Sequence, residues 1–209
     1  MTIGWNILGI FAWLVIILYL VFIVQNIRKR HLLMIVRDRK RFRWTTTLID
    51  AIEVIVFFVA TIFMVMITFF TTPDLENKKV ISSKIEYEPL IMSTDNNQSY
   101  YVVATSSSKS APRQRYKFYS NKERITVSSN YASISDGKDP MSIEANAIPY
   151  SKEGLEKADK QYQNAYVSIY TATYKKNWYN GIGLHSGKMA TRYYLIRIPD
   201  QTFVKRVKD

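Results

Sequence analysis

The sequence predicts an α+β protein, in which an N-terminal two-helix transmembrane hairpin precedes a small, mainly antiparallel, β-rich extracytoplasmic domain with one helix. Two long apolar runs occupy residues 4–24 and 48–70, and a strongly cationic segment separates them. The rest of the chain alternates short runs of strand-forming residues with turn residues. We therefore expect the hairpin to cover residues 1–70, a linker 71–79, and the domain 80–209.

Each apolar run is long enough to cross a bilayer as a helix. The first has 21 residues and no charge, and the second has 23 residues, of which only Asp50 and Glu53 are charged. At a rise of 1.5 Å per residue, about 20 residues cover a hydrocarbon core of about 30 Å. A cleaved signal peptide needs positive charge before its apolar run. Residues 1–4 hold none, so we expect the first run to be retained as a span.

The segment between the runs predicts the orientation. Residues 25–47 hold eight cationic side chains against one carboxylate, and such segments stay in the cytoplasm. We therefore expect a cell-membrane protein with two spans, whose N-terminus and C-terminal domain are extracytoplasmic. The apolar residues 31–36 could alternatively lie in the inner interface. The residues expected to determine topology are Arg28, Lys29, Arg30, Arg37, Arg39, Lys40, Arg41 and Arg43.

Asp50 and Glu53 share one helix face, because they are three residues apart. One interpretation is a functional intramembrane carboxylate pair that serves protons or a partner subunit. In the other, Thr47 caps the second helix, Asp50 completes the cap, and Arg41 or Arg43 pairs with the carboxylates at the headgroups. Glu53 is the deeper of the two and the better functional candidate.

After the linker, most of the chain has the pattern of β-strands. Val, Ile, Tyr and Thr recur in short runs between turn residues such as Asp136-Gly137. One helix is expected from Ser151, an N-cap residue type, as far as about residue 164. Residues 177–188 hold three glycines and are expected to form a loop. The expected strands lie at 80–92, 100–104, 115–120, 125–135, 166–174, 192–198 and 202–207.

The C-terminal part is basic and rich in tyrosine. Residues 71–209 hold 14 of the 15 tyrosines, with 21 Lys and Arg against 14 Asp and Glu. Aromatic rings and cations together can bind a sugar-phosphate or an acidic glycan. Tyrosines alternating with cations are also what a solvated sheet face contains. The candidate residues for binding an anionic ligand are Arg113, Arg115, Tyr116, Lys117, Lys175, Lys176, Trp178 and Tyr179.

Several kinds of chemistry are not expected. The chain has no cysteine, and the expected topology places His31 and His185 on opposite sides of the membrane. The outer domain therefore lacks the His and Cys ligands of a usual zinc site. The chain also lacks a cysteine that could act as a nucleophile. Ser186 follows His185 but does not stand in the Gly-x-Ser-x-Gly pattern of a nucleophile elbow. We expect no catalytic residue, no metal-binding residue and no cofactor. A pair of carboxylates for glycoside cleavage is brought together by folding, so the spacing of residues in the sequence does not exclude one.

Three features carry a resemblance to a family. They are the opening Gly4-Trp5-Asn6, the arginine-rich hairpin, and the segment Tyr194-Leu195-Ile196-Arg197-Ile198-Pro199-Asp200. With them the chain resembles a group of uncharacterised small two-span membrane proteins of lactobacilli and related lactic acid bacteria. The resemblance implies a Gram-positive cell membrane and carries no activity. An envelope rich in teichoic acids would suit a cationic outer domain.

The expected function is that of a membrane-anchored cell-envelope protein without catalytic activity. Its basic, tyrosine-rich domain would bind a protein partner or an anionic wall polymer, and the bilayer itself would be a partner. The alternative is an accessory or regulatory subunit of a membrane transporter or sensor, which acts through the hairpin. A carboxylate-dependent wall hydrolase is the third possibility. Nucleic acid is not an expected partner, because the cationic loop is short and membrane-bound.

Overall fold

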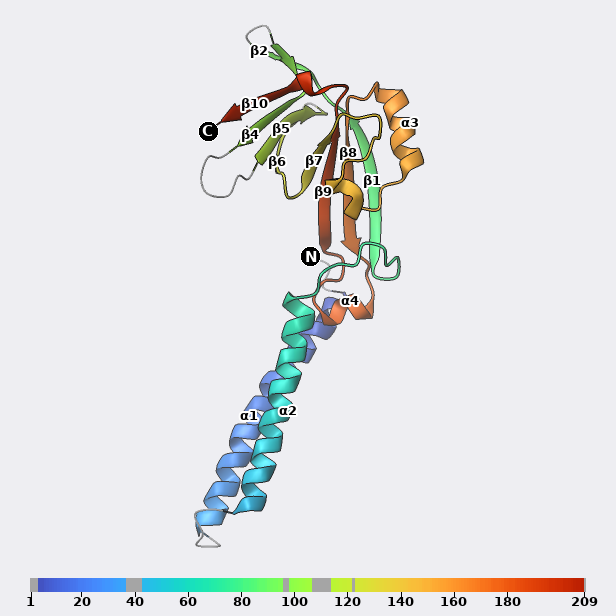
Figure 1. The fold of residues 1–209 in the computed structure, drawn as a ribbon. Coiled ribbons are helices and arrows are strands. Elements are labelled where there is room, and N and C mark those ends of the chain that lie inside the picture. Colours follow the sequence, from blue (N-terminus) through green and yellow to red (C-terminus); the bar gives the residue numbers. More distant parts are fainter. Residues whose placement is uncertain (1–3, 37–42, 96–97, 107–113, 122, 209) are drawn as a thin grey trace. The chain divides into compact units, whose positions relative to one another are not determined.

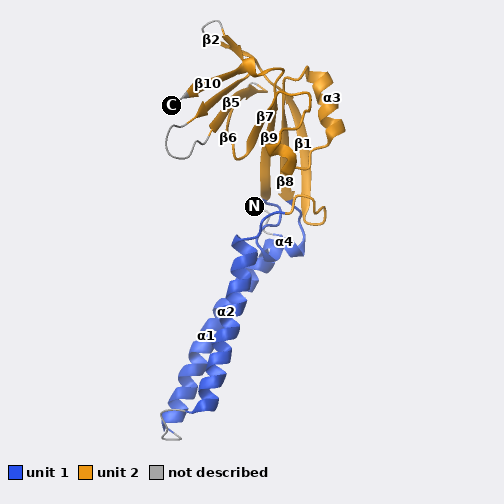
Figure 2. Ribbon diagram, viewed as in Figure 1, with its two compact units in different colours: residues 1–73, 174–188 blue, residues 74–173, 189–209 orange. Residues whose placement is uncertain are grey.

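A computed structural model describes residues 4–36, 43–95, 98–106, 114–121 and 123–208. The chain divides into two compact units (Figure 2). Unit 1 comprises Met1–Pro73 and Tyr174–Lys188, and unit 2 comprises Asp74–Thr173 and Met189–Asp209. Five of the residues named from the sequence lie outside the described residues, namely Arg37, Arg39, Lys40, Arg41 and Arg113.

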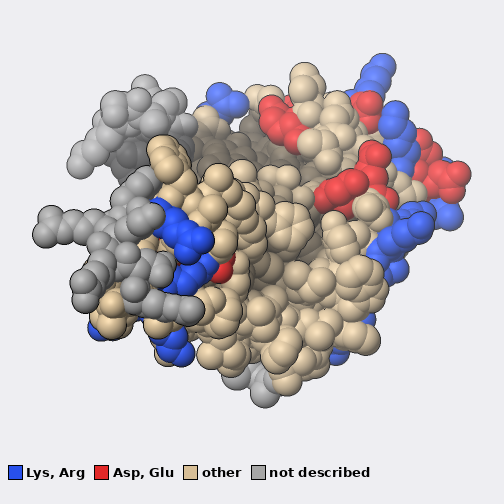
Figure 3. Space-filling view, turned by 90° about the horizontal axis from the view of Figure 1, so that it is seen from below, with Lys and Arg blue, Asp and Glu red and all other residues tan. Residues whose placement is uncertain are grey.

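Unit 1 is built on two long antiparallel helices, α1 (Asn6–Val36) and α2 (Trp44–Phe69) (Figure 1). Both are long and apolar enough to cross a membrane. Large apolar side chains such as Ile17 and Phe63 are about 60% exposed, so much of the apolar surface of these helices is not covered by other described residues. In the space-filling view of Figure 3, most of the visible surface carries no charged side chain.

Both helices extend into the segment expected to be a loop. α1 continues to Val36, and α2 begins at Trp44. The residues added to α1 are mostly Arg, Lys, Leu, Met and Ile, which fit a helix well. Thr47 is therefore inside α2 and does not cap it. Arg43 occupies the N-cap position without a side-chain capping bond, so the capping interpretation of Asp50 is wrong.

Unit 2 contains two four-stranded sheets and a two-stranded ribbon (Figure 1). Sheet A has the order β1 (Ile81–Pro89), β8 (Tyr166–Tyr174), β9 (Met189–Arg197) and β7 (Ala132–Ser135). Sheet B has the order β10 (Val204–Lys208), β4 (Val102–Ser106), β5 (Gln114–Ser120) and β6 (Glu123–Ser128). The ribbon pairs β2 (Ser93–Asp95) with β3 (Gln98–Tyr100).

The pairing is mainly antiparallel, as the sequence predicts. β8 pairs with β9, β4 with β5, and β5 with β6 in antiparallel register. Two pairs, β10 with β4 and β7 with β9, are parallel. The single strand expected at 125–135 is two strands in different sheets, because the chain turns at Ser128–Tyr131, where the Tyr131 N–H donates to the Ser128 carbonyl at 2.9 Å.

The core of unit 2 lies between the two sheets. Val102 and Phe118 from sheet B are buried against Val167 and Ile196 from sheet A. Helix α3 (Lys152–Tyr162) occupies the expected position, and Ser151 caps it by accepting a hydrogen bond from the Gly154 N–H. Two short 3₁₀ helices, η1 (Glu144–Ala147) and η2 (Gln201–Phe203), complete the unit.

The expected loop at 177–188 contains a short helix, α4 (Trp178–Ile182). Asn177 caps it by accepting a hydrogen bond from the Asn180 N–H at 2.9 Å. Although it connects β8 with β9 along the chain, this stretch belongs to unit 1. The cap of α4 was readable from Asn177, but the glycines at 181 and 183 favoured a loop.

Candidate functional site

The two carboxylates of the hairpin contact Arg30 and His31 of the other helix. The Arg30 guanidinium pairs with Glu53 and lies 3.3 Å from Asp50 Oδ1. The His31 Nε2 lies 3.0 Å from Asp50 Oδ2. The side chains of Asp50 and Glu53 are only 12% and 19% exposed. The structure thus joins both predicted intramembrane residues to Arg30, a residue assigned only to topology, and to His31, which had no assigned role.

The charged cluster consists of Arg30, His31, Asp50 and Glu53, and two of its buried atoms, Arg30 Nε and Asp50 Oδ1, have no hydrogen-bond partner among the described residues. A buried carboxylate is costly unless a cation compensates it. Here both carboxylates share the Arg30 guanidinium from the facing helix. The cluster links α1 to α2 through side chains that are far apart in the sequence.

In unit 2, one face of sheet B carries a group of cations. Successive side chains of a strand point to opposite faces. Phe118 and Tyr116 point toward the core, so Arg115 and Lys117 point away from it. On the neighbouring strand, Ile125 and Val127 contact the core, which places Arg124 on the same face as Arg115 and Lys117. We call Arg115, Lys117 and Arg124 the cationic face.

The cationic face has no internal compensation. None of its three cations pairs with a carboxylate among the described residues. Lys117 is opposite Thr126 in the register, and Arg124 is opposite Tyr119, so Lys117 and Arg124 are diagonal neighbours at about 7–8 Å. On the edge strand β10, Lys205 lies on this face too, but it pairs with Asp95 at 2.5 Å. That hydrogen bond raises the pKa of Lys205.

The predicted ligand patch is divided by the fold. Tyr116 lies on the opposite side of its strand from Arg115 and Lys117, because strand residues alternate. Burial raises the pKa of the Tyr116 hydroxyl, and the charge of Glu144 raises it further. The other members, Lys175, Lys176, Trp178 and Tyr179, are exposed and belong to unit 1.

A cleft of about 780 Å³ opens where the core face of sheet B meets β7 and η1. The same strand face that buries Phe118 continues into the cleft with Tyr116 and Gln114. The Tyr116 hydroxyl donates to Gln114 Oε1 at 3.1 Å. Two carboxylates, Asp136 and Glu144, and the Arg206 guanidinium line the cleft. The sequence analysis did not find it, because strands from distant parts of the chain form it.

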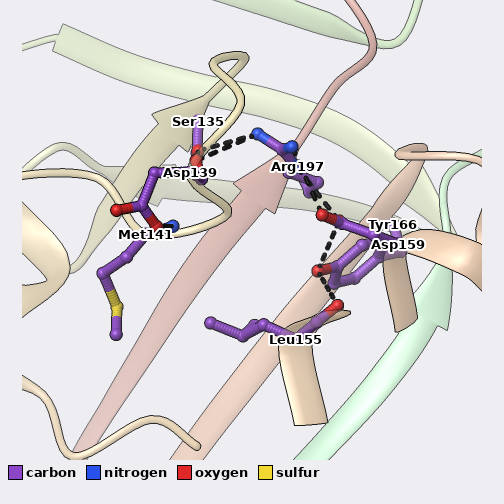
Figure 4. A network of polar contacts seen from close by, with 7 residues as sticks. All are labelled: Ser135, Asp139, Met141, Leu155, Asp159, Tyr166 and Arg197. Atoms are coloured by element: carbon purple, nitrogen blue, oxygen red, sulfur yellow. Dashed lines mark hydrogen bonds and ion pairs between the residues drawn. The ribbon is translucent and has the colours of Figure 1, made fainter. Parts of the chain in front are cut away.

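A buried polar network centres on Arg197 (Figure 4). Its guanidinium is bidentate to Asp159, with Nε donating at 3.1 Å to Oδ1 and Nη2 at 3.3 Å to Oδ2. Nη1 donates to Ser135 Oγ at 3.1 Å. The Tyr166 hydroxyl donates to Asp159 Oδ1 at 3.0 Å. Burial raises the pKa of Tyr166, and the charge of Asp159 adds to this effect.

The network explains the motif at residues 194–200. Leu195, Ile196 and Ile198 are fully buried. Arg197 is 3% exposed and holds α3 against β9 and β7 through Asp159 and Ser135. Asp200 accepts a hydrogen bond at 2.8 Å from the backbone N–H two residues later, which starts η2 and lowers the Asp200 pKa. The motif thus contributes buried core residues, a buried ion pair and the N-cap of η2.

Among the described residues, no group of three or more His, Cys, Asp or Glu side chains has the arrangement of a metal site. His185 is bonded through its ring Nε2 to the Ile67 carbonyl at 3.2 Å and stacks on Tyr174. It is therefore a packing residue of unit 1.

Comparison with known proteins gives one family. A family model matches residues 4–205, which is almost the whole chain, and this family is named for a lactobacillus locus tag. No curated protein and no solved structure matches the chain.

Proposed function

Because the chain belongs to this lactobacillus family, we propose that it is a membrane-anchored module of a Gram-positive cell envelope, without catalytic activity. The two apolar helices span the cell membrane with the loop between them inside. Unit 2 is extracytoplasmic and binds an anionic wall polymer through the cationic face. The observation that carries this proposal is the unpaired state of Arg115, Lys117 and Arg124 among the described residues.

Charge and exposure support this use of the face. Like charges about 7–8 Å apart repel one another, and compensating carboxylates on neighbouring strands would relieve that repulsion. Here the strands supply Thr126 and Ser128 opposite the β5 cations instead. A polymer that carries a phosphate in every repeat would provide the missing negative charge and could track across the sheet.

Binding is tested with the full chain in lipid nanodiscs and a poly(glycerol phosphate) polymer. The triple variant Arg115→Gln, Lys117→Gln, Arg124→Gln should bind about tenfold more weakly, because each exposed ion pair contributes about 0.5 kcal/mol. Added salt should weaken binding of the unaltered protein. The matched control replaces three exposed cations of α3 (Lys152, Lys157 and Lys160) by Gln, with the same change in net charge. If both triple variants lose the same amount of polymer affinity, the binding depends on net charge alone and the cationic face is not the site.

Orientation is tested separately. Since the chain has no cysteine, single cysteines can be labelled without background. An impermeant maleimide should label Lys157→Cys in intact cells, and Thr45→Cys, at the start of α2, only after lysis. The opposite pattern would invert the topology and remove the outer-domain role.

One observation favours a second candidate function. A carboxylate-dependent wall hydrolase needs a cleft that holds two carboxylates, and the cleft in unit 2 is lined by Asp136 and Glu144. The full-length protein would then release new reducing ends from purified wall glycan, and Glu144→Gln would abolish the release. An unaltered protein that releases none would end this candidate.

A further inference from the structure

The stretch that contains α4 is docked on the hairpin. We call residues 175–186 the α4 segment. The Asn6 side chain, at the start of α1, is bonded twice to the segment. Its Nδ2 donates to the Ser186 carbonyl, and its Oδ1 accepts from the Ser186 N–H, both at 3.0 Å. With the bond between His185 and the Ile67 carbonyl, these contacts fasten the segment to both helices.

The contact is close enough to require glycine. A Cβ atom on Gly181 would lie 2.2 Å from the Trp5 carbonyl oxygen. One on Gly9 would lie 2.6 Å from the Ile182 carbonyl oxygen. Real Cβ contacts are never that short, so the backbones of α1 and the α4 segment meet at a distance that only glycine permits. The segment therefore has a defined height along the hairpin.

That height corresponds to a membrane boundary. The charged cluster around Arg30 marks one end of the apolar part of α1. Gly9 precedes Arg30 by 21 residues, which spans about 30 Å of helix and equals the thickness of a hydrocarbon core. If the cluster lies at one edge of the core, the α4 segment lies at the other edge, where headgroups begin.

The segment exposes the side chains that favour this region. Trp178 and Tyr179 are 58% and 62% exposed and pack edge to face, with ring centroids 6.0 Å apart. Lys176 beside them is exposed as well. Tryptophan and tyrosine concentrate at membrane interfaces, because their rings are apolar and their N–H and O–H groups remain hydrated.

We propose that the α4 segment is a third membrane contact of the protein. Trp178 and Tyr179 lie in the headgroup region of the outer leaflet, and Lys176 contacts lipid phosphate. This inference rests on the proposed membrane location. It goes beyond that proposal because the segment comes from the connection between two strands of sheet A, outside the apolar runs.

The test uses fluorescence of the full chain in phosphatidylcholine vesicles. A variant with Trp5, Trp13 and Trp44 replaced by Phe retains only Trp178. Its emission should be blue-shifted, and bromine attached near the headgroup end of the lipid chains should quench it more than bromine near the chain end. Emission of a water-exposed indole, quenched by soluble iodide but not by brominated lipid, would overturn the proposal and leave a protein partner as the ligand of these rings.

A matched variant separates this inference from the membrane location itself. Retaining only Trp13, about one turn deeper on α1, reports insertion of the hairpin. If Trp13 is quenched by brominated lipid and Trp178 is not, the spans hold and the α4 contact fails. If neither is quenched, the membrane location fails. In the Trp178 protein, Asn6→Ala should lower quenching, because it removes both bonds to Ser186, and unchanged quenching would refute the docking as its cause.

Discussion

Arg197 shows how one residue ties distant segments together. Of the described residues, only Arg197 and Asp50 are charged and buried. Arg197 joins β9, which carries it, to α3 through Asp159 and to β7 through Ser135. A buried cation that loses its carboxylate remains uncompensated, which costs far more than the pair contributes.

Asp159→Ala should therefore destabilise the protein by about 3–5 kcal/mol, measured by chemical unfolding followed through the β signal in circular dichroism. Glu156→Ala changes an exposed carboxylate of the same helix and should stay within about 0.5 kcal/mol. Equal effects of the two changes would show that Arg197 finds other partners and that the network in Figure 4 is dispensable.

In the hairpin, Arg30 has the role that Arg197 has in unit 2, because it links two helices through carboxylates. Arg30→Gln leaves Asp50 and Glu53 close together without the guanidinium between them, so thermal stability in nanodiscs should fall by about 2 kcal/mol, less than for a fully buried pair because Arg30 is 24% exposed. Arg28→Gln removes an exposed cation of the same helix and should have little effect. If both variants unfold at the same temperature, the charged cluster contributes no stability beyond the effect of net charge.

At the scale of elements, sequence periodicity identified both long helices, α3 and most strands, because each follows an apolar pattern of one period. The helix ends were less accurate, since Arg, Lys and Met continue a helix as readily as they fill a loop. The pairing of Arg30 with Asp50 was accessible in principle. These residues lie equally far from the middle of the turn between 36 and 44, so antiparallel helices bring them to the same height.

The candidate surfaces were only partly predictable for a related reason. Arg115, Tyr116 and Lys117 are neighbours in sequence, but a strand sends the middle residue to the opposite face. Arg124 belongs to the cationic face because β6 pairs with β5. The cleft is lined by residues as far apart in the sequence as Ala104 and Arg206. No local pattern encodes such contacts.

The docking of α4 makes Gly181 sensitive. Gly181→Ala should destabilise unit 1 by about 2 kcal/mol, because its Cβ would overlap the Trp5 carbonyl oxygen and force the segment away from α1. Gly137→Ala has no Cβ contact closer than 3.9 Å and serves as the control. Thermal unfolding of both variants in nanodiscs gives the comparison. A Gly181→Ala protein as stable as the control would show that the close approach is not required.

At the scale of the whole molecule, buried tyrosines set an alkaline limit to stability. Burial raises the pKa of Tyr150 and of Tyr166 above the ordinary value of 10.0. Above pH 10 the unfolded chain loses these protons while the folded chain keeps them, so unfolding becomes easier as pH rises. The free energy of unfolding should fall by about 1.4 kcal/mol per pH unit for each tyrosine.

Chemical unfolding at several pH values from 8 upward measures this slope. Tyr150→Phe should make the slope shallower. Tyr131→Phe should not, because Tyr131 is 58% exposed. A flat profile above pH 10 would mean that neither buried hydroxyl controls alkaline unfolding.

The membership of the α4 segment in unit 1 also determines how the chain responds to cutting. The polypeptide passes between the units three times, after Pro73, before Tyr174 and after Lys188. A protease that cleaves the stretch at 74–79 would leave the C-terminal fragment still clasped to the helices through Ser186 and His185. Release of unit 2 into the medium would thus need a second cleavage or the loss of these contacts. A protein cleaved only at 74–79 would stay in one piece.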